Sequence, residues 1–397
     1  MTFSSALLMV IADDLSGAAE IAGRALEHGL TTEVWTWEKF LERGTQSVRP
    51  SLLVIDSNTR SSSKTEARNR LRQLGKNLEP SPIRLFKKVD SVLRGPLISE
   101  LNGLTEGLSQ KRVLLVPSNP SRERVVRQGQ YWIKNKPIHK TQFGKDPEYP
   151  AQSSHVVDIL RSQPGDLPVS ILPPNSNLTN TGILVGEATT LSDLDMWVKE
   201  LDENTLAAGA ADFFQAWLQL HAPQKRNSAV DPLSLNISER VLLVSGSAST
   251  TSSRTIESWK KKGTPVLNIP TSLLENENNS DHLIRTWMQT VIKSFQLKSR
   301  VVVNIGHPLK RDVDLKEHLR LHLAELTSKV LSNCSLDHLW VEGGSTASTL
   351  VRHLKWNQFE VLGSLSPGVV TLRQFKKELP LITLKPGSYA WPDVFCV

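Results

Sequence analysis

The sequence predicts an α/β fold made of two α/β domains, the first organised around a parallel sheet. Short apolar segments typical of buried strands alternate with longer segments typical of helices, which is the order of parallel sheets covered by helices. The length of 397 residues exceeds the size at which single cores stop growing. We expect an N-terminal domain over residues 1–221, a linker over 222–240 with two prolines and little periodicity, and a C-terminal domain over 241–397.

The net charge of +7 leaves three classes of partner open: nucleic acid, an acidic surface, or a small anionic molecule. Basic residues are scattered along the chain, and it contains no aromatic-rich basic strand of the kind found in RNA-binding sheets. This distribution argues against nucleic acid and favours a small phosphorylated or carboxylated ligand. A basic surface that only contacts solvent is the alternative.

The two cysteines, Cys334 and Cys396, can form neither a disulfide framework nor a Cys-based zinc site, which favours the reducing cytoplasm. The apolar run Ala6–Ala12 has no basic residue ahead of it, so we expect a buried strand rather than a signal peptide. No segment is long enough to cross a bilayer, so no membrane partner is expected. Whether the chain forms a homo-oligomer stays open.

The first predicted strand covers residues 7–12 and ends in Asp13 and Asp14, with a helix running from there to about Gly29. Ligands of such folds bind beyond the carboxyl ends of the strands. Two adjacent carboxylates at this position can bind a polyol or a hydrated Mg²⁺. The alternative is that Asp14 or Ser16 only caps the helix, which would explain one acid but not two.

The second and fourth predicted strands also end in polar residues. Residues 52–55 lead into Asp56 and Arg60 ahead of a basic helix over 64–74, and residues 113–116 lead into a polar segment that contains Arg124. The carboxyl ends of parallel strands meet at one edge of a sheet, so we expect these side chains to lie near Asp13 and Asp14. A salt bridge between Asp56 and Arg60 within their loop is the alternative.

The third strand end is the densest in functional groups. The segment 85–95 places Lys88, Asp90, Ser91 and Arg94 within seven residues, and a helix follows Gly95. Cations together with a carboxylate can hold an anionic, hydroxylated molecule and orient one of its hydroxyls. A plain salt bridge between Lys88 and Asp90, two apart on one face of a strand, is the alternative. The position at the third of four polar strand ends favours a binding site.

The region from 130 to 221 is less regular. Residues 141–150 are expected to form an ordered loop, which at this length is usually functional or a lid. A further strand is predicted at 182–185, a helix at 191–201, and the start of another helix at 210–214.

The second domain contains two candidate phosphate-binding loops. The strand 241–244 enters Ser245–Ser253, and the strand 339–342 enters Gly343–Leu350. Small residues between a strand and a helix N-terminus can surround a phosphate with N–H groups, although either loop alone could be an ordinary turn. Tight turns at 363–368 and 385–388 could close over the same ligand. The sequence has no P-loop motif, and no dinucleotide fingerprint follows the first strand.

Eight short motifs, in order and spanning nearly the whole chain, resemble those of the four-carbon acid sugar kinases, the threonate and 3-oxo-tetronate kinase family. They are Ile11–Ala19 (IADDLSGAA), Asp56–Arg60 (DSNTR), Lys87–Gly95 (KKVDSVLRG), Thr141–Pro147 (TQFGKDP), Val244–Ser247 (VSGS), Gly343–Ala347 (GGSTA), Leu362–Gly368 (LGSLSPG) and Leu384–Gly387 (LKPG).

The resemblance implies an N-terminal acid-sugar-binding domain, a C-terminal nucleotide-binding domain, and ATP-dependent phosphorylation of a terminal hydroxyl of a four-carbon acid, with Mg²⁺. The residues expected to bind the acid are Asp13, Asp56, Arg60, Lys88, Ser91 and Arg94. Those expected to bind the nucleotide are Ser245, Ser247, Gly343, Gly344, Ser345, Thr346, Gly368 and Gly387. Metal ligands are not assigned.

A carboxylate that accepts the proton of the substrate hydroxyl would complete the site. Asp90 is the first choice for this role and Asp14 the second. The chain departs from the family at Ser345, where an acid is frequent, and at Glu123, where glycine is common, so its substrate can differ. A non-catalytic sensor of acid sugars or nucleotides is the alternative function. An oxidoreductase is disfavoured because the glycine fingerprint is missing.

Overall fold

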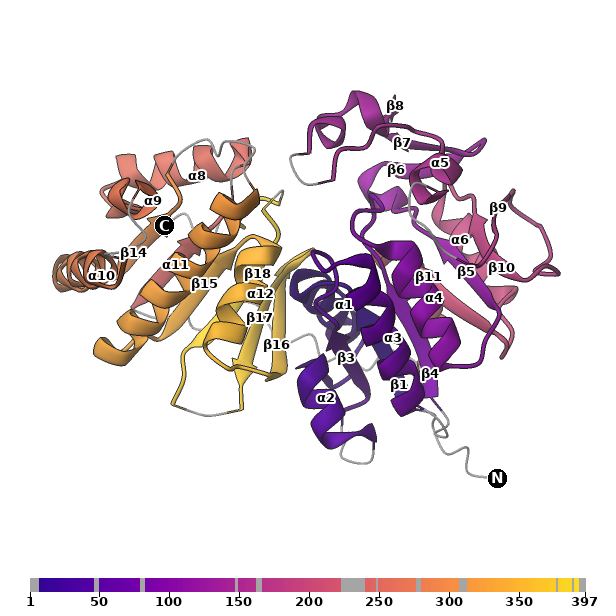
Figure 1. Ribbon diagram of the computed structural model, residues 1–397, viewed down its shortest axis with the longest axis horizontal. Coiled ribbons are helices and arrows are strands. Elements are labelled where there is room, and N and C mark those ends of the chain that lie inside the picture. The colour runs from indigo at the N-terminus through magenta and orange to yellow at the C-terminus, as the bar shows by residue number, and fades with distance from the viewer. Residues whose placement is uncertain are drawn as a thin grey trace. The chain divides into compact units, whose positions relative to one another are not determined.

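The computed structural model describes residues 7–45, 50–78, 83–146, 149–161, 166–222, 240–247, 249–275, 280–306, 313–375, 378–387 and 389–392 (Figure 1). The chain divides into two compact units, Met1–Asn227 and Ser228–Val397. The predicted linker over 222–240 lies outside the described residues except for Ala222 and Arg240.

The first unit contains a sheet of parallel strands, as predicted. In spatial order these are β2 (Thr32–Thr36), β3 (Leu52–Asp56), β1 (Leu7–Ala12), β4 (Ile83–Lys88), β11 (Thr205–Gly209), β5 (Arg112–Val116), β10 (Gly182–Gly186) and β9 (Val169–Leu172). The predicted strands at 7–12, 52–55, 113–116 and 182–185 are confirmed. The sequence analysis missed β2, β9 and β11, and β11 separates β4 from β5.

Helices cover both faces of this sheet. They are α1 (Leu15–Glu27), α2 (Trp37–Arg43), α3 (Lys64–Leu78), α4 (Leu97–Gly107), α5 (Val156–Arg161), α6 (Leu191–Lys199) and α7 (Ala211–His221). On one face Met9 and Leu53 belong to the core that includes α3 and α4. On the other face Phe86 packs against Phe213 and Phe214 of α7, with ring centroids 5.8 and 5.4 Å apart. The buried apolar strands follow from this double coverage.

A small antiparallel sheet follows the fourth strand end of the first unit. It consists of β6 (Arg124–Arg127), β7 (Gln130–Ile133) and β8 (Lys136–Pro137). A short 3₁₀ turn, Ile138–Lys140, precedes the segment 141–150 that was predicted as an ordered loop, and a second one, Gln142–Lys145, lies within it. Residues 147–148 of this segment lie outside the described part.

The second unit also has a mostly parallel sheet. Its strands lie in the order β13 (Val266–Asn268), β14 (Arg300–Asn304), β12 (Val241–Ser245), β15 (His338–Glu342), β18 (Leu381–Lys385), β17 (Val369–Gln374) and β16 (Gln358–Ser366). The first five are parallel, and β17 is antiparallel to both of its neighbours. The helices are α8 (Thr250–Lys261), α9 (Ser272–Glu275), α10 (Ser280–Leu297), α11 (Val313–Asn333) and α12 (Gly344–His353).

One sequence prediction about this unit was wrong. Residues 363–366 do not form a tight turn, because β16 continues through them as far as Ser366. Only Pro367 and Gly368 form the turn of a hairpin, where Gly368 has φ of 83°. The regular alternation in this stretch is interrupted by Gly363 and Pro367, which hid the strand. No helix among the described residues is long and apolar enough to cross a membrane.

Helices α3 and α4, which lie side by side in Figure 1, approach each other through glycines. A Cβ on Gly103 would lie 2.1 Å from the carbonyl oxygen of Arg68, and one on Gly107 would lie 2.4 Å from that of Arg72. The contact is made by backbone atoms, so no side-chain rotation can make room.

We therefore expect Gly103→Ala to destabilise the first unit, although alanine favours helices. Overpacking typically costs about 1–3 kcal/mol and the gain in helix propensity is about 1 kcal/mol, so the free energy of unfolding should fall by up to about 2 kcal/mol. Denaturant unfolding followed by circular dichroism measures the change. The exposed Gln73→Ala on α3 is the control and should stay within about 0.5 kcal/mol of wild type. A Gly103→Ala protein as stable as wild type would contradict the close contact.

Candidate functional site

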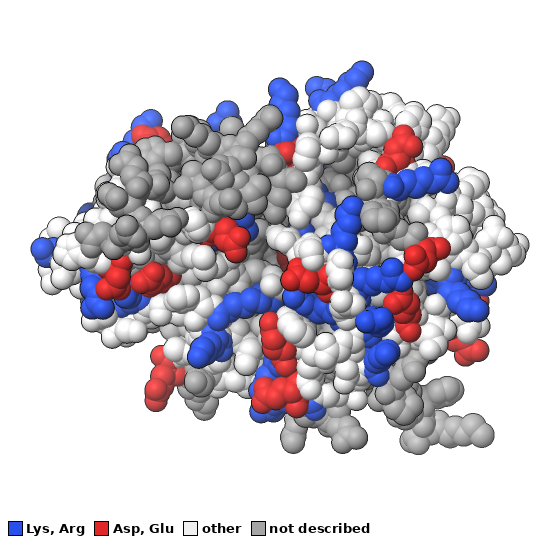
Figure 2. Space-filling view, viewed as in Figure 1, with Lys and Arg blue, Asp and Glu red and all other residues white. Residues whose placement is uncertain are grey.

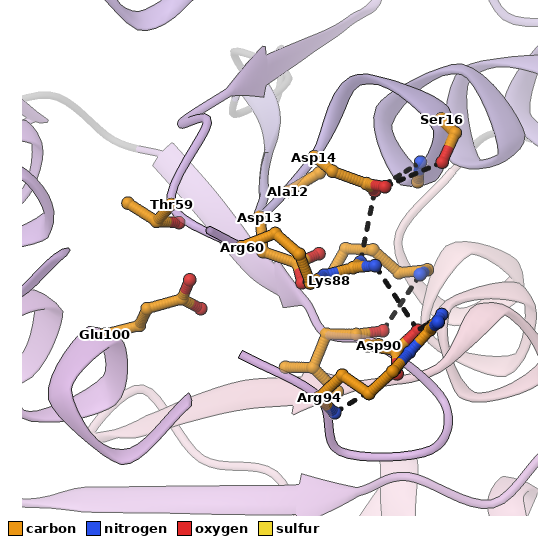
Figure 3. Close-up of polar contacts among 12 residues, drawn as sticks. Ala12, Asp13, Asp14, Ser16, Thr59, Arg60, Lys88, Asp90, Arg94 and Glu100 are labelled. Carbon is orange, nitrogen blue, oxygen red and sulfur yellow. Dashed lines mark hydrogen bonds and ion pairs between the residues drawn. The ribbon is translucent and has the colours of Figure 1, made fainter. Parts of the chain in front are cut away.

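Three loops of the first unit converge because of the strand order. Strand β1 lies between β3 and β4, so the residues that follow these three strands meet at one edge of the sheet. Figure 3 shows Asp13 and Asp14, Arg60, and Asp90 with Arg94 gathered there. The sequence predicted this set, and the structure brings it together.

Arg60 is at the centre of the cluster and is largely buried. Its Nε donates to Asp13 Oδ2, while its two terminal nitrogens lie 3.2 Å from Asp14 Oδ1 and 3.5 Å from Asp90 Oδ1. The hydroxyl of Tyr149 donates to the carbonyl oxygen of Arg60 at 2.7 Å. A Cβ on Gly95, whose φ is 84°, would lie 3.0 Å from that same oxygen. The guanidinium thus contacts three carboxylates from two other loops, and its own loop is packed closely.

Asp90 is held by a second arginine through a bidentate pair. Nε and Nη2 of Arg94 each donate to an oxygen of Asp90 at 2.9 Å. The N–H groups of Val92 and Arg94 also donate to Oδ2, at 3.3 and 3.2 Å. Burial alone would raise the pKa of Asp90, but Arg94 and Arg60 outweigh it and hold the pKa far below its usual range. Both oxygens of Asp90 are therefore engaged.

Asp14 caps helix α1, as the alternative interpretation of this residue proposed. Oδ1 accepts from the N–H of Gly17 at 2.8 Å, and Oδ2 accepts from the hydroxyl of Ser16 at 2.7 Å. A Cβ on Gly17 would lie 2.7 Å from Asp14 Oδ1, so glycine lets the helix start this close to its cap. Since Arg60 also contacts Oδ1, both oxygens of Asp14 have partners.

Asp13 differs from the other two acids. Its Oδ2 binds Arg60, but its Oδ1 is buried and has no hydrogen-bond partner among the described residues. Burial tends to raise the pKa of Asp13, yet Arg60, Lys87 and Lys88 together lower it below the usual value. A buried acceptor without a partner costs free energy, so a polar group of a ligand is expected at this oxygen.

Lys88 does not form the salt bridge with Asp90 that was the alternative interpretation of this segment. Its ammonium donates to the carbonyl oxygen of Val89 at 2.9 Å and lies 3.8 Å from Glu20 of α1. The neighbouring Lys87 is completely buried and pairs with Glu100 of α4 at 2.8 Å. Consecutive residues of β4 point to opposite faces of the sheet. Lys87 therefore pairs with α4 on one face, while Lys88 lies on the face of the carboxylate cluster.

The two remaining predicted acid-binding residues are in different surroundings. Asp56 is fully buried, and its Oδ1 accepts from the N–H of Asn58 at 2.9 Å, which shapes the turn before Arg60. The hydroxyl of Ser91 accepts from Nη1 of Arg124 at 2.6 Å. Arg124 stacks on Phe143 at 5.3 Å and lines a basic cavity of about 920 Å³ beside the loop.

Glu123 explains one departure from the family pattern. Its φ is 54°, in the left-handed region that glycine adopts without strain. The resemblance led us to expect glycine here, and this chain forms the turn with a residue that has a side chain.

In the second unit the predicted nucleotide loops also converge. Ser245, Glu342 and Lys385 end three adjacent parallel strands, and the segments 246–247, 343–346 and 386–387 follow them. The second of these segments is Gly343 together with the first turn of α12. The hydroxyl of Ser249 donates to the carbonyl oxygen of Gly387 at 2.6 Å. A cavity of about 300 Å³ lies beside Ser247, lined also by Asn268, Asn304 and Gly306 at the ends of β13 and β14. Gly368, on the β16–β17 turn, lies at the same edge of the sheet, because the antiparallel register pairs Val370 with Leu384, and a Cβ on Gly368 would lie 2.2 Å from the ring of Tyr389.

The sequence analysis did not identify Glu342, Lys385, Tyr149 or Glu20 as functional. A charged residue at the end of an otherwise apolar strand was a usable signal for the first two, since the same pattern identified Lys88. The tyrosine and Glu20 act from other segments, and local spacing could not reveal them.

The described residues offer few ligands for Mg²⁺. No group of three or more His, Cys, Asp or Glu residues that could hold a metal occurs in the described part of the chain. Near the candidate nucleotide loops of the second unit, Glu342 has both of its oxygens engaged by serines and a lysine, while Glu257 of α8 lines the cavity that includes Ser247. Mg²⁺ commonly binds through phosphate oxygens, water and one or two carboxylates, so the chain fits an ion that arrives with the nucleotide.

Two family models match this architecture. Residues 8–217 match a sugar-binding N-terminal domain, and residues 242–394 match a nucleotide-binding C-terminal domain. The fold and the two sites therefore define a two-domain protein that pairs a sugar-binding unit with a nucleotide-binding unit. More particularly, the chain belongs to the four-carbon acid sugar kinase family.

Relatives in three bacteria support that assignment. D-threonate kinase of Salmonella typhimurium is 22% identical, with 98% of this chain and 96% of the relative covered. 3-Oxo-tetronate kinase of Brucella melitensis is 22% identical, with 98% and 94% covered. D-erythronate kinase of Heliobacterium modesticaldum is 25% identical, with 47% and 46% covered.

Solved structures share the fold. A Salmonella typhimurium protein described as a putative tRNA synthase superposes with a TM-score of 0.73 at 18% identity, covering 97% of this chain and 96% of that one. A Haemophilus influenzae protein gives a TM-score of 0.66 at 20% identity, with 98% of both chains covered. At these identities the likeness establishes the fold.

The lowered pKa values of Asp13 and Asp90 predict acid sensitivity. An aspartate in an unfolded chain has a pKa of about 3.9, so these carboxylates stabilise the fold above about pH 4 and lose that contribution as the pH falls through their lower folded values. The free energy of unfolding should therefore drop steeply below about pH 4, as urea titrations at several pH values would measure. Asp90→Asn should flatten this slope, and Asp195→Asn, which removes an exposed carboxylate on α6, should not. Equal slopes in wild type and Asp90→Asn would contradict the pairing.

Proposed function

We propose that this protein is an ATP-dependent kinase that phosphorylates a hydroxyl of a four-carbon sugar acid such as a threonate, an erythronate or an oxo-tetronate. The observation that carries the proposal is the buried, unpartnered Oδ1 of Asp13 among Arg60 and Lys88, in a chain of this family. An acceptor for a hydroxyl within a cationic cluster suits an acid that carries both a carboxylate and hydroxyls. The named relatives are kinases of such acids.

Cations dominate the surroundings of the proposed acid site. The ammonium of Lys88 donates one N–H to the carbonyl oxygen of Val89 and has further N–H donors. Arg124 contacts Ser91 and also lines the basic cavity. Figure 2 shows that Lys and Arg also project over the region of β6 to β8, where the cavity-lining lysines are located. A positive field of this kind raises the local concentration of an anionic substrate and tolerates the added charge of a phosphorylated product.

The geometry supports Asp13 better than Asp90 as the acceptor of the hydroxyl proton. Asp90 and Asp14 have both oxygens engaged, whereas Asp13 keeps one free. A base in phosphoryl transfer mainly orients the hydroxyl and takes its proton late, so a lowered pKa does not disqualify it. Arg60 would hold the carboxylate of Asp13 in position for this role, and the choice of Asp90 from sequence stays a prediction.

The nucleotide is proposed to bind in the second unit. The N–H groups of the loops at 246–247 and 343–346 and of Gly387 would surround phosphates, and the cavity of about 300 Å³ beside Ser247 would take another part of ATP. Mg²⁺ bound with ATP would neutralise charge on the phosphates. We also propose the cytoplasm as the compartment, in keeping with a sequence that contains only two cysteines.

A substrate panel tests the kinase proposal. We expect ADP release from ATP only when a four-carbon sugar acid is present. A coupled spectrophotometric assay measures this release. The corresponding tetritols, which lack the carboxylate, are the control and should react at least about tenfold more slowly, because a charged hydrogen-bonded contact is worth about 1.5–3 kcal/mol. Binding of an acid without any ADP release would favour the sensor instead. Acid-dependent reduction of a nicotinamide would favour an oxidoreductase.

The proton acceptor is tested by two isosteric variants. Asp13→Asn should lower kcat by about 10²–10⁴-fold with a smaller effect on the KM of the acid, because it removes a proton acceptor used in the transition state. Asp90→Asn should raise the KM of the acid with a smaller loss of kcat, because it disturbs Arg60 and Arg94. Steady-state kinetics of both proteins separates the two effects. The reverse pattern would return the role to Asp90.

A further inference from the structure

A row of buried polar side chains underlies the nucleotide loops of the second unit. Ser245, Glu342 and Lys385 are the last residues of β12, β15 and β18, and the sheet register places them directly beside one another. Their exposed fractions are 0%, 0% and 1%. Because these parallel strands end at the same level, the carboxylate of Glu342 and the ammonium of Lys385 lie in one buried layer.

The carboxylate of Glu342 collects donors from three elements. Oε2 accepts from the hydroxyls of Ser245 at 3.1 Å and Ser252 of α8 at 2.9 Å. Oε1 accepts from the ammonium of Lys385 at 2.6 Å. The two serines come from the strand and the helix on either side of one loop, so the carboxylate fixes both ends of that loop.

Lys385 is equally saturated. Besides Glu342, its ammonium donates to the carbonyl oxygens of Pro386 at 3.1 Å and Tyr389 at 2.6 Å. An ammonium has three N–H donors, and all three are used here. Lys385 therefore keeps no donor for a phosphate, which distinguishes it from a lysine that binds the nucleotide directly.

Backbone contacts couple the three loops that start from this row. The N–H of Gly246 donates to the carbonyl oxygen of Glu342 at 3.1 Å, and that of Gly343 donates to the carbonyl oxygen of Lys385 at 2.9 Å. A Cβ on Gly246 would lie 1.9 Å from the hydroxyl oxygen of Thr346, so the first two loops touch. A shift of any strand end would move all three loops.

A buried ion pair is a costly way to stabilise a fold. Two apolar residues of similar volume are often as stable or more so, because the pair must first lose its water. Burial lowers the pKa of Lys385, and Glu342 opposes that shift, so the charge on the lysine depends on its partner. Glu342 and Lys385 lie in a buried layer next to a candidate ligand site, so we looked to that site for the role of the pair.

We propose that Glu342 and Lys385 are positioning residues of the nucleotide site, which set the three loops for the phosphates without touching the nucleotide. This inference rests on the proposed function, since it assumes that these loops bind ATP. The polar network fixes one arrangement of the loops, which an apolar layer of equal stability would not specify. Misplacement of binding groups by about 1 Å can cost on the order of a hundredfold.

The test compares Glu342→Gln, Lys385→Met and the double variant that carries both changes. Each single variant leaves one buried charge without its partner, so both should lower Tm and weaken ATP binding. The double variant buries no charge, so it should regain most of the lost Tm while ATP binding stays weaker than wild type by between about tenfold and a hundredfold. Calorimetric titration with ATP and thermal unfolding give the two readouts. Arg373→Ala, which breaks the exposed pair with Glu360 on β16 and β17, is the control.

The milder Ser245→Ala keeps the charges and tests the same idea if the charge variants do not fold. It should raise the KM of ATP severalfold and leave the KM of the acid unchanged. A double variant or Ser245→Ala that binds ATP like wild type would overturn the positioning role and leave the kinase proposal intact. Tight ATP binding by wild type without phosphorylation of any acid would overturn the kinase proposal alone, and wild type that binds no nucleotide would overturn both.

Discussion

The contact of one guanidinium with three carboxylates is the constraint on which the N-terminal site depends. Asp13, Asp14 and Asp90 come from two strand ends, and like charges at this distance repel one another unless a cation lies among them. Arg60, delivered by a third strand end, supplies that cation. Arg94 and the cap of α1 occupy the other oxygens, so of these three carboxylates only Asp13 keeps a buried oxygen without a partner among the described residues. The oxygen available to a ligand is therefore the one that no neighbouring side chain occupies.

The second unit uses the same design with the charges reversed. Here a carboxylate, Glu342, is the shared group, and donors from a strand, a helix and a neighbouring strand surround it. In both units a buried charge at the carboxyl edge of a parallel sheet ties together loops that are far apart in the sequence. The parallel arrangement makes this possible, because all its strands deliver their loops to one edge.

Much of the fold was predictable from local pattern. Apolar runs bounded by polar turns predicted the strands around the site, and glycine-rich segments indicated loops that follow β12 and β15 of the second unit. The strand β11, Thr205–Gly209, was missed because its sequence TLAAG is short and rich in small residues, which have low β propensity. Burial between β4 and β5 makes it a strand, and that is a tertiary effect.

By itself the sequence determined which residues stand at the strand ends, because hydrophobic periodicity and turn residues fix the order of elements. That was enough to bring Asp13, Asp14, Arg60, Asp90 and Arg94 into one candidate site. Only the tertiary structure decided which of their atoms pair with one another and which stay available to a ligand. Which oxygen stays free depends on hydrogen bonds between loops separated by dozens of residues, and each partner is chosen by geometry that no local spacing encodes.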